Sequence, residues 1–235
     1  ATCNSVSRRV PPATRVIPHS HRIGFGAVGK EALKKAHVHA LAERIAYDVS
    51  VFDQFACISP QVYFLEEGGD VSPWEFVAAL AQAMKSLEKT FPPAQLTIED
   101  AAVLRHMQAS CELRELGGED VCIMAGENLG WTIVCEPLRE LIPSPLYRFI
   151  RIIPVRDLKD IAAYLEPLKG YMQNAGLEVT EERRPELFNL LARMGVSRIC
   201  PAGKMPTPSM MWHHDGLACI GEMVRWTDAE MFNET

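Results

Sequence analysis

The sequence has no block of basic residues, no apolar run as long as a membrane span and no basic-then-apolar opening segment. Without a basic surface the chain cannot neutralise a phosphate backbone, and its formal net charge is -6, so nucleic acid is not an expected partner. The lack of a long apolar run excludes a transmembrane helix, and the lack of a secretory signal pattern favours a cytoplasmic protein.

Paired cysteines are also missing. The seven cysteines stand at positions 3, 57, 111, 122, 135, 200 and 219, an odd number without short paired spacings. This distribution excludes a disulfide framework and a zinc ribbon, and we expect reduced thiols. The chain begins with Ala1 instead of methionine, and its first nine residues are not typical of the start of a domain. We therefore expect a piece of a longer protein.

The composition that remains is that of a globular protein. With 235 residues, 48% hydrophobic and 23% charged, the chain can build one sizeable core or two small ones. Its last third alternates strand and helix patterns: strands at Phe149–Val155, near Leu177–Val179 and at Val196–Cys200, with helices opened by Asp157 and near Pro185. Such alternation is typical of parallel strands joined by helical crossovers, and it predicts an α/β fold with a mostly parallel sheet flanked by helices.

The first two thirds fit the same class. Apolar residues recur at helical spacing between Glu31 and Tyr47, and Gln61–Leu65 is rich in strand-forming residues. The order Ser72-Pro73-Trp74-Glu75 is a capping signature and predicts a helix that runs to about Leu87. The remaining expected elements are a strand at Arg15–Pro18, a helix at Thr97–Leu116, two antiparallel strands at Val121–Met124 and Trp131–Cys135, a loop at Met205–Asp215 and a short helix at Leu217–Trp226.

The spacing Gly24-x-Gly26-x-x-Gly29-Lys30 fits two phosphate-binding patterns. A phosphate-binding loop needs serine or threonine after the lysine, but Glu31 stands there, and its carboxylate would lie among phosphates. A dinucleotide site needs a buried strand that leads directly into the first glycine, whereas two histidines and an arginine intervene. We favour the alternative, in which the glycines allow close packing between strand and helix where a side chain would not fit.

Histidines offer possible metal ligands at His213-His214-Asp215. Adjacent residues cannot normally all converge on one ion, so a solvated or capping loop is favoured over a metal site there. His37 and His39 point to different faces of the expected helix and are interpreted as surface residues. We therefore predict no metal.

Cys57 lies at the junction between the helical pattern that ends near Tyr47 and the strand pattern that begins at Gln61, with Pro60 stopping any helix just after it. A cysteine at such a turn can act as a nucleophile. Free cysteine is also among the residue types most often buried in a core. From the residue alone, both interpretations stay open.

The stretches around Cys57 form a specific block: the helix end AYDVS at 46–50, then DQFACISPQ at 53–61 and the strand VYFL at 62–65. Supporting stretches are HRIGFG at 21–26, PSPLYR at 143–148 and WHHDG at 212–216. Together they resemble the LuxC-type acyl-CoA reductases, the fatty-acid reductase family of bacterial luminescence, which belongs to the aldehyde dehydrogenase superfamily. The resemblance runs over nearly the whole chain and implies an aldehyde dehydrogenase-like catalytic domain.

The resemblance implies an oxidoreductase that converts a long-chain fatty acyl-CoA to the aldehyde in two half-reactions. Cys57, as thiolate, would attack the thioester and keep the acyl group on sulfur. A hydride from a reduced nicotinamide, expected to be NADPH, would then release the aldehyde. Family position makes His21 the candidate base, since it lies where the superfamily carries a carboxylate base. A plain hydrogen bond from His21 to a backbone carbonyl is the alternative.

The opening residues resemble the superfamily's short cofactor-facing turn, so Thr2, Asn4 and Ser5 are the expected cofactor contacts. Cys3 stands where glycine is usual, and a left-handed turn there would be strained. Most of the cofactor site is therefore expected outside this chain. The implied organisation is a nucleotide-binding tail at 1–20, a catalytic thiol domain at 21–200 and a C-terminal loop and helix at 201–235.

The expected partners are a long-chain acyl-CoA or acyl-protein, acyl-transferring proteins and further copies in a homo-oligomer. Two alternatives of different class stay open beside the reductase. One is a nucleotide-binding module that uses Gly24 to Lys30. The other is a truncated, inactive domain that keeps the oligomerising surfaces of a reductase.

Overall fold

The computed structural model describes residues 2–19, 21–138, 142–218 and 220–230. The strands are β1 Ile23–Val28, β2 Pro60–Glu66, β3 Cys122–Ala125, β4 Thr132–Cys135, β5 Phe149–Val155, β6 Met172–Glu178 and β7 Arg198–Cys200. The α-helices are α1 Thr2–Ser7, α2 Val38–Ser50, α3 Pro73–Leu87, α4 Ile98–Leu116, α5 Ile161–Leu165 and α6 Arg184–Arg193. Among these helices none is long and apolar enough to cross a membrane.

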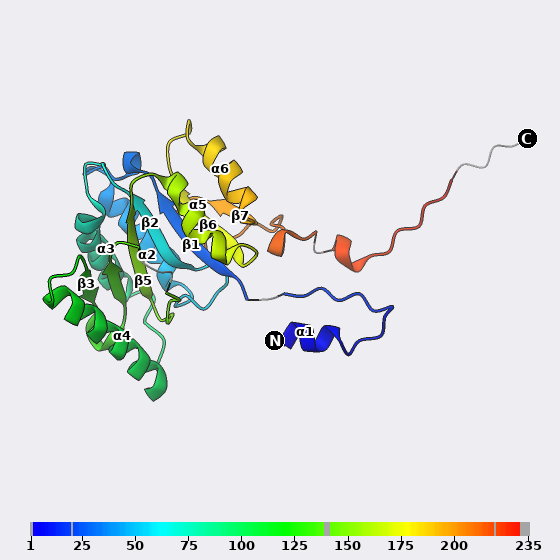
Figure 1. Cartoon of the computed structure of the whole chain (residues 1–235), viewed down its shortest axis with the longest axis horizontal. Coiled ribbons are helices and arrows are strands. Elements are labelled where there is room, and N and C mark those ends of the chain that lie inside the picture. The colour runs from blue at the N-terminus through cyan, green and yellow to red at the C-terminus, as the bar shows by residue number, and fades with distance from the viewer. Residues whose placement is uncertain (1, 20, 139–141, 219, 231–235) are drawn as a thin grey trace, which may run out of the picture.

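The strands form one sheet in the order β3-β4-β5-β2-β1-β6-β7 (Figure 1). Neighbouring strands run parallel throughout, except for the antiparallel pair β3 and β4. The predicted α/β class, the mostly parallel sheet and the antiparallel excursion are confirmed. Because all strands but β3 run the same way, the segments that precede them meet at one end of the sheet.

Each face of the sheet has its own core, because successive side chains of a strand point to opposite sides. Tyr63 and Leu65 pack with α2 and α3 on one face, whereas Phe64 packs with α5 and α6 on the other. The helix α4 covers Val134 and Phe149 in a third, smaller cluster. The sheet is thus a layer between helices, and its positions are fixed from both sides.

The predicted capping signature forms as expected at the start of α3. The Ser72 hydroxyl accepts a hydrogen bond from the Glu75 amide at 3.2 Å, and the Glu75 carboxylate accepts one from the Ser72 amide at 2.8 Å. The predicted helix at Thr97–Leu116 is confirmed as α4, with Thr97 as its cap. Local chemistry therefore sets the boundaries of these two helices.

Two predicted elements are absent, and a third begins later than expected. Arg15–Pro18 forms no strand, because no neighbouring strand supplies backbone partners there. The helix expected from Glu31 begins only at Val38, because Glu31 and Leu33 are held by other segments: the Glu31 carboxylate accepts from the Thr180 amide and the Leu33 carbonyl from the Val71 amide.

The helix expected at Leu217–Trp226 is also absent. Apart from residue 219, which lies outside the described residues, this stretch holds a 3-10 turn at Gly221–Met223. Its large side chains Ile220, Met223 and Trp226 are about four-fifths exposed. A short helix is stable only where its apolar face packs against other apolar side chains. Within the described chain no such core covers these three side chains.

Candidate active site

Cys57 lies at the amino end of the parallel strands. It stands three residues before β2. The segments that lead into the other parallel strands end at the same edge, at Arg22 before β1, Tyr147 before β5, Tyr171 before β6 and Ser197 before β7. The Cys57 side chain is half-buried. The turn before β2 therefore brings the thiol to the edge where several other loops converge.

Two residues with left-handed backbone, Asp53 (φ 47°) and Gln54 (φ 66°), begin the turn that carries Cys57. The buried Arg148 holds Asp53 by an ion pair and donates to the carbonyls of Phe91 and Pro92 at 2.9 and 3.2 Å. The Gln54 amide donates to the carbonyls of Pro60 and Phe149 at 2.8 and 3.2 Å. The turn lies outside the regular helices and strands, and these side-chain contacts help to hold it. The loop is therefore fixed both before Cys57, at Asp53, and after it, at Pro60.

The loop is also fixed from β1 and β6. Asn174, fully buried on β6, donates to the Ile58 carbonyl at 2.8 Å. A Cβ placed on Gly24 would lie 2.6 Å from the Ser59 carbonyl oxygen, and a Cβ on Gly26 would collide with the Tyr63 ring. Glycine is required at both positions because the backbone and ring approach so closely.

This packing settles the interpretation of the glycine motif. Gly24 and Gly26 lie inside β1 and not at a strand-to-helix turn. A phosphate would need their amides free at a helix start, whereas β1 pairs on both sides with β2 and β6. The nucleotide-binding interpretation of Gly24 to Lys30 is wrong, and close packing is confirmed. The two glycines pack against strand β2 and the cysteine loop, and not against a helix as expected.

Charges near Cys57 act in opposite directions on its thiol. Burial raises the pKa of Cys57, and the negative charge of Asp215 raises it further. The backbone amides of Cys57 and Ile58 and the Arg22 guanidinium lower the pKa but do not outweigh the first two. The thiol is therefore protonated at neutral pH, and a base is needed to form the nucleophile.

The Asp215 carboxylate contacts one arginine and two histidines at this edge of the sheet. Its side chain is 1% exposed and its backbone is left-handed at φ 57°. One carboxylate oxygen accepts from Arg22 Nε at 3.0 Å and the other from His19 Nδ1 at 2.7 Å. His214 Nδ1 lies 3.5 Å from the second oxygen, and the His19 and His214 rings are 5.1 Å apart.

The same three residues, His19, His214 and Asp215, offer ligand atoms that lie within 4.8 Å of one another. Zinc binds nitrogen and carboxylate ligands of this kind. In the structure, however, both oxygens of Asp215 already accept hydrogen bonds, one from Arg22 and one from His19. The group is thus arranged as a hydrogen-bonded cluster, in which the arginine supplies the cation.

His21 is placed differently from the other predicted site residues. Its side chain is exposed and lines a cavity, and among the described residues it makes no hydrogen bond to Cys57 or to a backbone carbonyl. The sequence singled out His21, gave no signal for His19, and pointed to Asp215 only as a possible metal ligand and as part of the family stretch at 212–216. The latter two are 196 positions apart, so no local pattern could have joined them.

The predicted cofactor contacts Thr2, Asn4 and Ser5 lie on α1, which the chain carries away from the sheet (Figure 1). Asn4 and Ser5 are exposed. A six-residue helix presents too few aligned amides to build an anion site. The glycine-rich turn at Gly68 and Gly69, between β2 and α3, leads into a helix start that the Ser72 side chain already caps. The described residues therefore do not form a cradle for a nucleotide.

A cavity of about 480 Å³ begins beside the cysteine loop at His21, Gly24 and Gln61. It continues along one face of the sheet between α4 and α5. Most of its wall is apolar, from Ile23, Phe25, Val62, Ile153, Leu165 and Leu168. Cavities of this size and character are typical of small-molecule sites.

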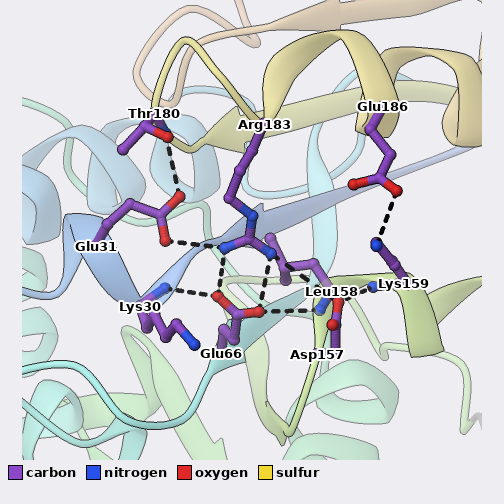
Figure 2. A network of polar contacts seen from close by, with 9 residues as sticks. All are labelled: Lys30, Glu31, Glu66, Asp157, Leu158, Lys159, Thr180, Arg183 and Glu186. Atoms are coloured by element: carbon purple, nitrogen blue, oxygen red, sulfur yellow. Dashed lines mark hydrogen bonds and ion pairs between the residues drawn. The ribbon is translucent and has the colours of Figure 1, made fainter.

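The opposite end of the sheet is filled by ion pairs (Figure 2). Glu66, at the end of β2, accepts two bonds from Arg183 at 2.6 and 2.9 Å and bonds from the amides of Lys30 and Leu158 at 3.0 and 3.4 Å. Glu31 holds the same guanidinium at 2.9 Å. At the carboxyl ends of the strands, where open α/β sheets usually bind ligands, these paired side chains line an open, polar pocket of about 410 Å³.

Comparison with solved structures supports the fold. The NADP-dependent glyceraldehyde-3-phosphate dehydrogenase of Bacillus halodurans, complexed with NADP, aligns with 86% of this chain and 42% of its own, with a TM-score of 0.57 and 12% identity. An NAD-dependent aldehyde dehydrogenase of Burkholderia multivorans aligns with 78% of this chain and 35% of its own, at 0.52 and 12%. The predicted aldehyde dehydrogenase-like fold is confirmed.

Sequence comparison identifies the family. The long-chain acyl-protein thioester reductase of Aliivibrio fischeri is 26% identical over 232 residues, covering 93% of this chain and 44% of that protein. The reductase of the same name from Vibrio harveyi is 25% identical over 196 residues, covering 83% and 39%. The chain thus spans less than half the length of these relatives. A family model described as acyl-CoA reductase (LuxC) matches residues 1–226, so the chain belongs to the LuxC acyl-CoA reductase family.

Proposed function

We propose that the complete protein reduces a long-chain fatty acyl thioester to the aldehyde through an acyl intermediate on Cys57. The observation that carries this proposal is the half-buried thiol at the amino end of β2, in a turn held by Arg148, Gln54 and Asn174. A thiol fixed in this way presents its sulfur in one orientation, which nucleophilic attack on a carbonyl requires.

The first half-reaction uses this chain's own residues. The Cys57 thiol loses its proton to a base, its sulfur bonds to the carbonyl carbon, and the donor thiolate leaves with a proton. The backbone amides near Cys57 are suited to stabilise the oxyanion of the tetrahedral intermediate. The donor is an acyl-CoA or an acyl-protein thioester, and the relatives' name favours the latter.

A reduced nicotinamide, NADPH in our expectation, would supply the hydride for the second half-reaction. Thr2, Asn4 and Ser5 stay the predicted cofactor contacts, and most of the cofactor site is expected outside this chain. We propose that residues 21–200 are the thiol domain, that 1–20 join it to a cofactor domain, and that the complete protein is an oligomer that meets acyl-transferring partners.

The experiment is covalent labelling of the complete protein with radiolabelled long-chain acyl thioesters, followed by peptide mapping. We expect label on Cys57, its loss in Cys57→Ala, and faster labelling by long than by short acyl chains if the apolar cavity holds the chain. The matched control is Cys122→Ala, a half-buried cysteine on the far strand β3. Undiminished labelling of the Cys57→Ala protein would sink the proposal.

A further inference from the structure

The hydrogen bond between His19 and Asp215 fixes which nitrogen of the imidazole carries a proton. An ionised carboxylate only accepts hydrogen bonds, so Nδ1 of His19, at 2.7 Å from the Asp215 oxygen, must be the donor. In neutral imidazole only one nitrogen carries a proton. The other nitrogen, Nε2, is therefore a free proton acceptor.

Asp215 is held rigidly enough to orient the imidazole. Arg22 binds its other oxygen at 3.0 Å, and only 1% of the Asp215 side chain is exposed. The left-handed backbone of Asp215 is sparsely populated by residues with a Cβ, and such backbone persists where the surroundings impose it, often at functional sites. The ring of His214 packs edge-on against that of His19 at 5.1 Å.

The carboxylate of the pair lies at the same edge of the sheet as the Cys57 thiol. Arg22 directly precedes β1, whose Gly24 touches the cysteine loop, and the charges of Arg22 and Asp215 both act on the Cys57 thiol. Two described histidines contact this carboxylate, and His19 does so at 2.7 Å whereas His214 Nδ1 lies at 3.5 Å, beyond hydrogen-bond distance for a well-formed bond.

We propose that His19 is the general base for Cys57 and that Asp215 is the residue that positions it. This inference rests on the proposed acyl transfer and replaces His21 in that role. His19 and Cys57 share no hydrogen bond in the structure. The proton therefore passes from the thiol to His19 through one water, or directly once the two side chains approach each other in the substrate complex.

The proton balance is complete without an added reagent. His19 Nε2 takes the proton of the Cys57 thiol as sulfur bonds to the acyl carbon. When the carbon–sulfur bond to the donor breaks, the imidazolium returns that proton to the leaving thiolate. Asp215 stabilises the imidazolium in between, as a buried carboxylate does when it holds a catalytic histidine.

The test measures the single-turnover rate of acyl transfer to Cys57 in the complete protein. We expect His19→Ala to slow acylation about a hundredfold, and added imidazole to restore part of the rate. The matched control is His39→Ala, an exposed histidine of α2, which should leave the rate unchanged. Circular dichroism and thermal unfolding report whether each variant is folded.

The pH profile supplies a readout that a structural role would not change. The groups that face His19 and Cys57 are Asp215, Arg22, His214 and the thiol of Cys3, which donates to the His19 carbonyl. Without the base, only thiolate already present can react. The His19→Ala rate should therefore rise about tenfold per pH unit until the thiol ionises, whereas the wild-type rate should depend much less on alkaline pH.

Asp215→Asn separates positioning from simple charge. If Asp215 acts only as a charge, its removal lowers the pKa of Cys57 and acylation speeds up. If Asp215 holds the His19 tautomer, the asparagine amide can favour the wrong one, and acylation slows at least about tenfold. The proposal is overturned by faster acylation in folded Asp215→Asn, or by an unaffected His19→Ala beside a slow His21→Ala or His214→Ala. Absence of acylation in the wild type would instead refute the proposed function.

Discussion

At the scale of single residues, the buried carboxylate Asp48 shows how the helix before the cysteine loop is tied to the end of the chain. It accepts hydrogen bonds from Tyr63 Oη at 3.0 Å and from the amides of Gly203 and Met205 at 2.7 and 3.1 Å. Burial nevertheless raises the pKa of the Asp48 carboxyl to about 6, because the three donors do not fully replace water. The charged form is thus disfavoured by folding.

This raised pKa predicts a pH-dependent stability. A group whose folded pKa lies above its unfolded value stabilises the fold fully below the unfolded pKa and loses that contribution as pH rises through the folded one. For Asp48 the loss runs between about pH 4 and pH 7 and amounts to roughly 3 kcal/mol. Urea unfolding of wild type and Asp48→Asn across this range measures it, and the difference isolates Asp48 from other titrating groups. Parallel curves for the two proteins would contradict the prediction.

At the scale of elements, the turn that carries Cys57 depends on a segment 95 positions away. Leu146, Tyr147 and Arg148 all have left-handed backbone, and they bring the Arg148 guanidinium to Asp53. The Tyr147 amide donates to the Asp53 carbonyl at 2.9 Å. The two segments stabilise each other, since each supplies the bonds that the other's irregular backbone leaves unmade.

Arg148→Lys is therefore expected to destabilise the protein by about 3 kcal/mol, because lysine cannot serve Asp53 and two carbonyls with one ammonium group in the same geometry. The Cys57 thiol should also be alkylated at a changed rate. Chemical unfolding and iodoacetamide kinetics check both effects. Arg193→Lys, on the exposed side of α6, is the control and should change stability by less than about 0.5 kcal/mol. Equal free energies of unfolding for Arg148→Lys and Arg193→Lys would contradict the role of Arg148 in holding the cysteine loop.

How far the sequence predicts the structure depends on whether the cause is local. The α3 cap and the Phe149–Val155 strand follow from adjacent residues, and both are confirmed. The β1 strand was missed because its glycines mask the strand pattern, and they are explained only by Tyr63 and Ser59 across the sheet. Cys57 was found through its family block. The partners of Asp215 could not be found, since they meet only in three dimensions.

At the scale of the whole molecule, the two ends of the sheet have different roles. The amino end holds the thiol, the half-exposed histidines and the apolar cavity, whereas the carboxyl end is cross-linked by the polar network around Glu66 (Figure 2). Through Arg183 and the amides of Lys30 and Leu158, Glu66 joins α6 to the segments after β1 and β5. A rigid far end lets the loops at the reactive end deviate from regular structure.

The Glu66 network gives the last prediction. Burial raises the pKa of Glu66, but the bonds from Arg183 and the two amides outweigh it, so the pKa is lowered from 4.5. A lowered pKa means a contribution that is present above the unfolded value and is lost as pH falls through the folded one. We expect Glu66→Gln to cost about 3 kcal/mol at neutral pH, because it leaves a buried network short of its charge, and much less at about pH 3.

The matched control is Lys159→Met, in the same region. Lys159 pairs with Glu186 at 2.8 Å, but both side chains are more than half exposed, so the pair should contribute less than about 0.5 kcal/mol. Urea unfolding of both variants at neutral and acid pH decides the matter. If the charge of Glu66 holds the carboxyl end of the sheet together, only Glu66→Gln lowers the free energy of unfolding, and the loss becomes smaller at acid pH. A loss that is the same at both pH values would show that Glu66 acts by shape and not by charge.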